Sequence, residues 1–320
     1  MLQAVLLFVL GLVLLIKGGD WFVDGATGIA RRFHVPELLI GATVVSIGTT
    51  IPEVMVSAAS ALGGHGEIAY GNAIGSVICN TALIAAITIA VRPSTVERKA
   101  IRTPLIFFFI AAVFYAGVAY TTGYFSRWVG LALLLMFTVY IVLCVRDAKN
   151  APDAPTDEIE EEDTTLVSEL GRLILGAALI AVGANLLVDN GTIIATCLGV
   201  PEAVIALTFV ALGTSLPELV TAVTALAKGH SDLSLGNVIG ANLFNLVLVS
   251  GVASALAPFQ IPVSRTVAGI NASLLIDIPV MLLVMLLLAV PALKKERLYR
   301  GQGIALLCIY AAFCVSQFVM

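Results

Sequence analysis

The sequence is poor in charge: only 12% of its 320 residues are Asp, Glu, Lys or Arg, whereas 59% are hydrophobic. Soluble globular domains carry about 25% charged residues, so this balance excludes that class of protein. The formal net charge is -4, which leaves no basic surface that would imply a nucleic-acid partner. We therefore predict a protein whose partner is the lipid bilayer.

Cysteine is scarce and has neither the paired nor the metal-ligand spacing that would give it a chemical role. The five cysteines lie scattered in apolar segments, where we expect them to be packing residues: Cys79, Cys144, Cys197, Cys308 and Cys314. The alternating pattern of an outer-membrane barrel is absent, and so are the basic start and the cleavage site of a secretory signal. The first apolar run, Leu2–Ile16, is therefore expected to begin a membrane helix.

What the sequence does contain is a series of long apolar runs, separated by Gly, Pro or charged residues. About 20 apolar residues cross the bilayer core as an α-helix, so these runs predict an all-α polytopic membrane protein with about ten transmembrane helices. The expected spans are residues 2–30, 37–63, 68–91, 102–121, 127–146, 165–195, 202–227, 232–257, 266–290 and 300–319. Residues 147–164 are rich in Asp, Glu and Pro, and we expect them to form a solvated, cytoplasmic linker.

One six-residue stretch occurs twice. Gly48–Glu53 (GTTIPE), the first-copy motif, returns 165 residues later as Gly213–Glu218 (GTSLPE), the second-copy motif. The same offset, without a gap, pairs the Gly-Asn dipeptides at 71–72 and 236–237 and the asparagines at 80 and 245. So many matches at one offset indicate a duplicated unit. The chain is therefore expected to consist of two five-helix repeats, residues 1–146 and 165–320.

An odd number of helices per repeat makes the second repeat enter the membrane from the opposite side, which gives inverted topology. The basic residues support this arrangement. If the loop that contains Arg31 and Arg32 is cytoplasmic, nearly all other loop cations fall on the same side, and Arg127 and Arg265 alone face the other. We therefore expect a multi-pass protein of the cell (plasma) membrane with both termini outside.

Each copy of the motif places a proline directly before a glutamate. Pro52 and Pro217 have no N–H to donate to the carbonyl four residues back, so the helix should break or kink there. Carbonyls that lose their backbone donor are tolerated in a membrane where protein, water or an ion satisfies them. An ionisable side chain near the bilayer centre costs about 2.5 to 3.5 kcal/mol on insertion scales. An ordinary kink is the alternative interpretation of each proline. The glutamates that follow, Glu53 and Glu218, favour an ion site.

Other oxygen-bearing side chains are expected close to the glutamates. Ser46, Thr49 and Thr50 fall near the helical stripe of Glu53 through spacings of three and four residues, and the third and eighth helices add hydroxyl and amide oxygens. Such oxygens suit Ca²⁺, which takes about 6 to 8 oxygen ligands at about 2.3–2.6 Å. Zinc and copper are disfavoured because no thiolate or imidazole belongs to the set.

Together these motifs resemble the alpha-repeats of the sodium/calcium exchanger branch of the calcium/cation antiporters. The resemblance covers essentially the whole chain and implies ten helices in two inverted five-helix repeats, with Na⁺ and Ca²⁺ as transported substrates and no cofactor. It also implies a central metal site to which Ser46 and Ala211 contribute mainly backbone carbonyls. The implied ligands are Ser46, Thr49, Thr50, Glu53, Ser76, Asn80, Ala211, Thr214, Ser215, Glu218 and Asn245.

Four positions bear on the coupling ion. Proton-coupled members of the superfamily carry G-N-x-x-E, whereas this chain has Gly75 and Gly240 at the last position, which favours sodium coupling. Asn245 stands where several relatives carry the Asp that is associated with potassium co-transport, so potassium is disfavoured. Ala241 replaces a serine that relatives often have, and it leaves the affinity or number of sodium sites open.

The resulting hypothesis is a secondary antiporter that exchanges Na⁺ for Ca²⁺ by alternating access around a midplane site with two glutamates. Ca²⁺ between the carboxylates would be locally neutral, whereas an empty site would keep two buried charges, and this penalty would enforce exchange over leak. The glycine-bearing first and sixth helices, Gly11–Gly28 and Gly171–Gly191, are candidates for the sliding elements.

Two alternatives are a proton-coupled Ca²⁺/cation exchanger and, less favoured, a cation channel. An enzyme is not expected, because no nucleophile or cofactor pattern accompanies the carboxylates. The oligomeric state, monomer included, stays open.

Overall fold

The computed structural model describes residues 2–149, 165–198, 213–263, 266–267 and 269–319. The first half begins with α1 (Leu2–Arg32). Two uninterrupted helical runs follow: the first is α2 (Glu37–Ile40), η1 (Gly41–Val45) and α3 (Ser46–Leu62), and the second is α4 (Gly66–Cys79), η2 (Asn80–Ala85) and α5 (Ala86–Val91). The half ends with α6 (Arg98–Thr121) and α7 (Arg127–Lys149). The second half contains α8 (Leu166–Cys197), α10 (Leu216–Ala227), a run of α11 (Ser231–Phe244), η4 (Asn245–Val249) and α12 (Ser250–Leu256), a run of η5 (Ser273–Asp277) and α13 (Ile278–Lys295), and α14 (Arg300–Val319). Segments labelled η are π-helical.

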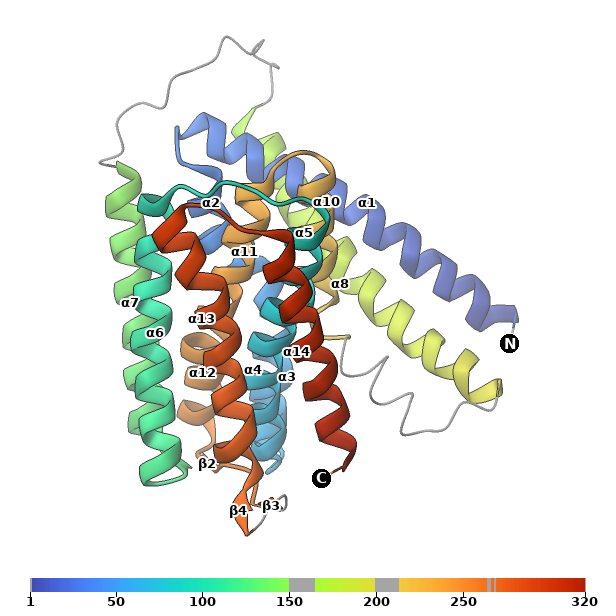
Figure 1. Ribbon diagram of the computed structural model, residues 1–320. Helices are drawn as coiled ribbons and strands as arrows, with labels where there is room; N and C mark the ends of the chain where they lie inside the picture. Colours follow the sequence, from blue (N-terminus) through green and yellow to red (C-terminus); the bar gives the residue numbers. More distant parts are fainter. Residues whose placement is uncertain (1, 150–164, 199–212, 264–265, 268, 320) are drawn as a thin grey trace.

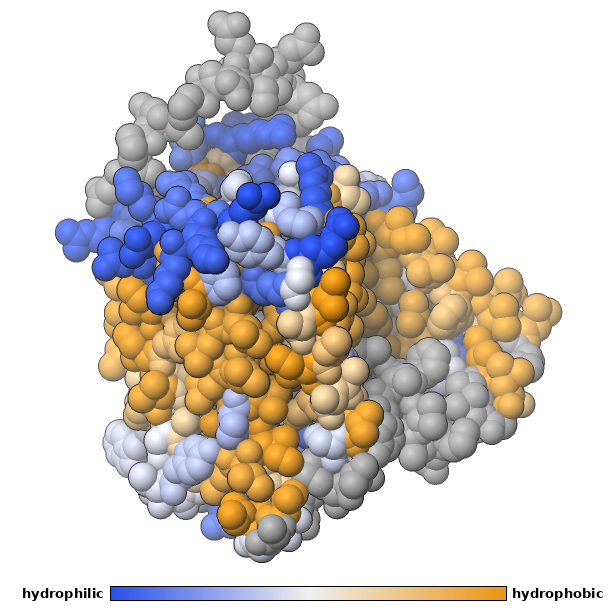
Figure 2. Space-filling model, in the orientation of Figure 1, coloured by the Kyte–Doolittle hydropathy of each residue, from blue (hydrophilic) through white to orange (hydrophobic). Residues whose placement is uncertain are grey.

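An apolar belt surrounds this bundle of helices. Among the described residues, eight helices or uninterrupted helical runs are long and apolar enough to cross a membrane, and α10 and α14 lie at the other two predicted spans. Figure 2 shows the belt between two more hydrophilic ends of the molecule. The predicted all-α polytopic membrane fold is therefore confirmed.

The structure changes the bounds of some predicted spans. The ninth was expected over 266–290, but β3 (Thr266–Val267) and β4 (Ile270–Asn271) form a hairpin first, and the helical run begins at Ser273. It then continues past Pro291 to Lys295. The carbonyl of Leu287, which the proline cannot satisfy, accepts a hydrogen bond from Gln302 Nε2 at 2.8 Å. A side chain of α14 thus replaces the missing backbone donor.

Two other predicted bounds can be compared only in part. The expected linker began at residue 147, but α7 continues to Lys149 before the described segment ends. The seventh span was expected over 202–227, and residues 199–212 lie outside the described part of the chain. Its described remainder is α10.

The inverted topology is visible where the first helices of the two repeats meet. Figure 1 shows α1 and α8 side by side, leaning away from the other helices. A Cβ on Gly11 would lie 2.8 Å from Gly183 O, and a Cβ on Gly18 would lie 2.9 Å from Gly176 O. Gly176 and Gly183 are the repeat counterparts of Gly11 and Gly18, so the two helices run antiparallel and touch through equivalent positions. Only glycine allows this close approach.

Ion pairs hold one end of the bundle together. Arg32 Nε lies 2.8 Å from Glu169 Oε2 and joins α1 to α8, while Lys228 Nζ lies 2.6 Å from Asp24 Oδ1 and joins α1 to the loop after α10. The loops after α5 and α13 pair there as well, through Thr95. This is the end at which the sequence places most of the basic residues, and Figure 2 shows it as the more hydrophilic one. At the opposite end, the short strands β1 (Tyr124–Phe125) and β2 (Phe259–Gln260) pair.

The prediction that the cysteines are packing residues is only partly right. All five are free thiols; Cys79 and Cys144 are buried, whereas Cys197 and Cys308 are exposed. The exposed pair lies on α8 and α14, at the periphery of the bundle in Figure 1. Lipid is as apolar as a protein core, so apolar neighbours in the sequence do not distinguish the two surroundings.

Candidate functional site

The two repeated glutamates meet inside the bundle. Glu53 of α3 and Glu218 of α10 are both completely buried, and they lie close enough for their charges to interact. In the described part of the chain, neither carboxylate has a basic ion-pair partner or a hydrogen bond within 3.5 Å, and the Thr49 hydroxyl is the neutral group that comes near Glu218. A buried carboxylate is stable only when a partner compensates its charge. The pair therefore requires a bound cation or a proton.

The two copies of the motif fold differently. α3 continues through Pro52, although the Gly48 carbonyl loses its usual donor four residues on. α10 instead begins at Leu216, so Pro217 stands in its first turn, where an N–H has no helical acceptor anyway. The predicted interruption is therefore confirmed at Pro217, whereas at Pro52 the helix does not break and a kink is the predicted alternative that is left. One missing hydrogen bond does not end a helix whose next turns pack against α4 and α11.

The other predicted ligands lie on or beside segments that pack against those carrying the glutamates. Those in the described residues are at most 4% exposed, except Thr214, which is half-buried. Most lie on α3, on α4 with η2 and on η4, and Thr214 and Ser215 come directly before α10. These segments contact one another. Oxygen or amide atoms of Thr50, Asn80 and Asn245 have no partner among the described residues. Ala211, the remaining predicted ligand, lies outside the described residues.

Each half of the site contains a π-helical segment that begins at a predicted ligand. η2 begins at Asn80 and η4 begins at Asn245, and these two asparagines are repeat counterparts. Single π-helical turns inside α-helices occur frequently at functional sites, because the extra residue redirects side chains. Residue type alone carries no signal for such a turn. The repeat offset, which pairs these two asparagines, is the only hint in the sequence.

Sequence reasoning missed two asparagines that contact the site. Thr49 Oγ1 donates to Asn237 Oδ1 at 3.3 Å, and Thr214 Oγ1 donates to Asn72 Oδ1 at 3.5 Å. Both bonds cross from one repeat to the other, and each is the counterpart of the other. The signal was present, since both asparagines belong to the repeated Gly-Asn dipeptides.

The packing of α11 against α3 restricts position 240. Ser46 Oγ donates to Gly41 O at 2.7 Å. A Cβ on Gly240 would come within 2.3 Å of Ser46 Oγ. A glutamate at this position, as in the proton-coupled exchangers, would require α3 or α11 to move. Next to it, Asn245 Nδ2 donates to Ala241 O at 3.0 Å, which turns the amide nitrogen toward the backbone and leaves Oδ1 unpartnered in the described structure.

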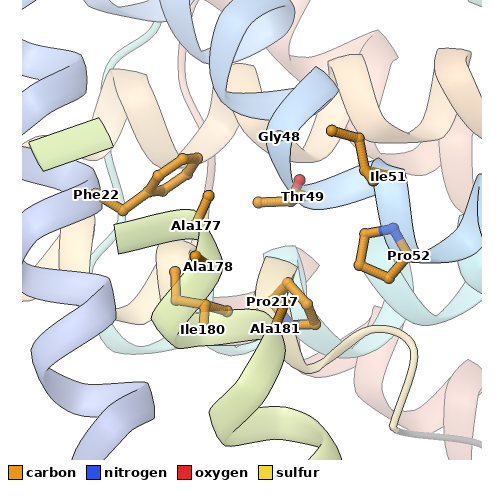
Figure 3. Close-up of a pocket in the computed structure, with 10 residues that line it drawn as sticks. All are labelled: Phe22, Gly48, Thr49, Ile51, Pro52, Ala177, Ala178, Ile180, Ala181 and Pro217. Carbon is orange, nitrogen blue, oxygen red and sulfur yellow. The ribbon is translucent and has the colours of Figure 1, made fainter. Parts of the chain in front are cut away.

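An apolar cavity of about 200 Å³ borders the two motifs. Its lining comes from α1 and α8 on one side and from α3 and α10 on the other, and Thr49 is the only polar residue among the ten described residues that line it. Figure 3 shows Pro52 and Pro217 on one side and Phe22, Ala177 and Ile180 on the other. The cavity thus lies between the pair α1–α8 and the two motifs, while α1 packs directly against α10 elsewhere, where a Cβ on Gly19 would come within 2.8 Å of Val220.

The chemistry of the site suits a hard cation. Among the described residues, no group of three or more His, Cys, Asp or Glu side chains could hold a metal ion. Two carboxylates with neutral hydroxyl, amide and carbonyl oxygens are the ligand types that Ca²⁺ prefers. Imidazole or thiolate ligands, which select zinc or copper, are not part of the set.

Comparisons with known proteins agree with this geometry. The family model described as sodium/calcium exchanger protein matches residues 3–146 and 168–319. The sodium/calcium exchanger MaX1 of Methanosarcina acetivorans is 30% identical over 350 residues, 98% of each chain, and the inner membrane protein YrbG of Escherichia coli is 36% identical over 271 residues, 82% of each chain. A solved structure of the sodium-calcium exchanger NCX_Mj, soaked with 100 mM Na⁺ and 10 mM Sr²⁺, matches with a TM-score of 0.83 and 34% identity, over 98% of both chains.

Proposed function

The chain belongs to the sodium/calcium exchanger family, and on that premise we propose that it exchanges Na⁺ for Ca²⁺ by alternating access around one site shared by its two repeats. It is an antiporter of a membrane and not an enzyme. The observation that carries the proposal is the pair of buried carboxylates, Glu53 and Glu218, without a partner in the described protein. The transported ions act as their partners in turn.

The charge of the pair explains exchange. Ca²⁺ neutralises both carboxylates, and bound Na⁺ ions compensate them and leave the site slightly positive, whereas a site without ions keeps two charges in a buried environment. Moving such charges between the two faces costs several kcal/mol or more. The loaded forms reorient and the unloaded form does not, so the flux of one ion depends on the counter-flux of the other.

We propose the eleven predicted ligands as the ion site, with Glu53 and Glu218 at its centre. Hydroxyl oxygens of Thr49, Thr50 and Ser215 and the amide oxygens of Asn80 and Asn245 complete it, together with backbone carbonyls freed at the motifs. The unpartnered oxygens of Thr50 and Asn245 support this assignment, because buried polar atoms normally have partners.

The elements that move in this proposal are α1 and α8. They contact each other along their length through small residues and lean away from the other helices (Figure 1). The apolar cavity between them and the motifs, with Thr49 at its edge, gives them room to shift past the site (Figure 3). Sliding of this pair would expose the site to one face and then to the other.

Sodium is the favoured coupling ion. A proton-coupled exchanger would need a titrating acid at the glycine positions of the Gly-Asn segments, and position 240 has no space for one beside Ser46 Oγ. Among the described residues of the site, Glu53 and Glu218 are then the only acidic side chains, so no further acid is present to carry a coupled proton. We therefore assign the coupling to Na⁺.

For the orientation, we propose the cell membrane, with the basic end of the bundle and the acidic linker 147–164 in the cytoplasm. The linker would join a first repeat at 1–146 to a second at 165–320, and both termini would lie outside. The excess of Lys and Arg at one end supports this assignment.

Epitope tags at each terminus should be accessible to antibody in intact cells, and a tag in the linker should become accessible only after permeabilisation.

The test of the function is counterflow in proteoliposomes with Na⁺, K⁺ and H⁺ gradients imposed one at a time and radiolabelled Ca²⁺ as tracer. An outward Na⁺ gradient alone should drive Ca²⁺ uptake. Uptake driven by a pH gradient without Na⁺ would favour the proton-coupled alternative. Ca²⁺ flux without any counter-ion would indicate a channel.

A further inference from the structure

We propose that Asn72 and Asn237 are positioning residues, each of which fixes a threonine hydroxyl of the opposite repeat so that its oxygen faces the transported cation. This inference rests on the proposed function, because Thr49 and Thr214 are among the proposed ligands. It concerns two side chains that do not touch the cation themselves.

The bonds are reciprocal across the two repeats. Asn237 on α11 reaches Thr49 on α3, at 3.3 Å, and Asn72 on α4 reaches Thr214 beside α10, at 3.5 Å. Asn72 lies 165 positions before Asn237, as Thr49 does before Thr214, so the two bonds are repeat counterparts. A contact that recurs in this way, between residues far apart in the chain, points to a shared role at the site.

The orientation of the amide is set by its second contact. Asn72 Nδ2 donates to Ser57 Oγ at 2.9 Å and to the backbone carbonyl of Glu53 at 3.4 Å. A carbonyl can only accept, so the nitrogen must point toward Glu53 and the oxygen must point toward Thr214. The same amide therefore ties the backbone of one glutamate to a ligand of the other repeat.

The Asn237 amide takes its orientation here from repeat equivalence with Asn72, because Asn237 Nδ2 has no partner among the described residues. In this orientation the amide oxygen has no hydrogen to give, which determines the direction of the threonine hydroxyl. The single hydrogen of Thr49 Oγ1 points to Asn237 Oδ1, and its lone pairs are then free for a cation. Without Asn237, the remaining acceptors near Thr49 Oγ1 are Ser46 O on its own helix, at 3.4 Å, and the carboxylate of Glu218. The hydroxyl would then rotate, and its lone pairs would no longer be held toward the site.

The experiment is a double-mutant cycle on the full chain that measures Ca²⁺ binding at equilibrium, together with KM and turnover of exchange in proteoliposomes. The substitutions are Asn237→Leu, which keeps the approximate size of the side chain, and Thr49→Val, which removes only the hydroxyl. Asn237→Leu should weaken Ca²⁺ binding about tenfold, the value of one well-placed hydrogen bond. In the Thr49→Val background it should have almost no further effect, because no hydroxyl is left to orient.

Two matched variants separate positioning from packing. In a Thr49→Ser background, which keeps the hydroxyl, Asn237→Leu should again cost about tenfold. The cycle of Asn72→Leu with Thr214→Val should show the same non-additivity, and it decides the question if Asn237→Leu does not fold. Equal losses from Asn237→Leu with and without the Thr49 hydroxyl would overturn the inference. An absence of sodium-driven Ca²⁺ uptake by the wild-type protein would instead overturn the proposed function.

Discussion

The two copies of the motif share almost the same six residues but not the same local structure. In the first copy the helix continues through Pro52, and in the second it begins beside Pro217. The side-chain bonds around them are nevertheless matched, since Thr49–Asn237 and Thr214–Asn72 are counterparts. Duplication has thus preserved the contacts of the site more closely than the backbone that carries them. The following predictions test how far this equivalence extends, from the largest expected effect to the smallest.

The equivalence should be complete for the glutamates. Glu53→Gln and Glu218→Gln should each abolish sodium-dependent Ca²⁺ uptake into proteoliposomes, because one carboxylate cannot neutralise Ca²⁺ and the other cannot compensate across the site. Glu67→Gln, an exposed carboxylate on α4, is the control and should transport normally. Full activity of either site variant would show that the two copies do not form one site.

The packing that supports the first copy should be intolerant of a single methyl group. Gly240→Ala would place a Cβ 2.3 Å from Ser46 Oγ and 2.7 Å from Ala42 Cα, so α11 must move away from α3. We expect a loss of about 1–3 kcal/mol in unfolding free energy and a marked loss of exchange. The control is Gly117→Ala on α6, where a Cβ would meet no described atom within 4 Å. Equal thermal stability of the two variants in detergent would contradict this account.

The prolines should differ, because their places in the helices differ. Pro52→Ala would give the Gly48 carbonyl its missing N–H donor. The unfolding free energy should therefore increase by about 1 kcal/mol and the melting temperature should rise, while Ca²⁺ affinity falls. Pro217→Ala lies in the first turn of α10, where the new N–H has no helical acceptor. Its melting temperature should stay within about one degree of wild type and its Ca²⁺ affinity within about twofold. Thermal melts and binding isotherms on the same samples check this. Equal changes in melting temperature and Ca²⁺ affinity for the two variants would show that the different positions of the two prolines in their helices do not affect function.

Ser46 should be the least sensitive position. The second repeat carries alanine at the corresponding position 211, and Ser46 Oγ is directed at Gly41 O and at Asn237. Ser46→Ala should therefore change the apparent Ca²⁺ affinity less than about threefold, since only one neutral hydrogen bond is lost. Thr49→Val, measured in the same uptake assay, should cost clearly more. A loss for Ser46→Ala as large as that for Thr49→Val would make its hydroxyl a ligand.

Much of this architecture could be predicted from the sequence. Long apolar runs identify helices without reference to their neighbours, and the offset between Glu53 and Glu218 predicted both the repeat and the pair of glutamates that the structure buries. The features that were missed depend on packing between distant segments. The helix continues past Pro291 because Gln302 of another helix supplies a donor, and the role of Asn237 exists only when α11 lies against α3. The π-helical turns at Asn80 and Asn245 are likewise invisible to residue type.

The central claim is that one carboxylate from each repeat forms a single Ca²⁺ site. Equilibrium binding of radiolabelled Ca²⁺ to the purified wild-type chain and to Glu53→Gln and Glu218→Gln, in detergent without Na⁺, tests it most directly. The account predicts saturable binding to the wild-type chain that Na⁺ displaces, and a loss of at least about a hundredfold in affinity for either variant, since each removes a buried charge partner. Unchanged Ca²⁺ affinity in either variant would contradict it.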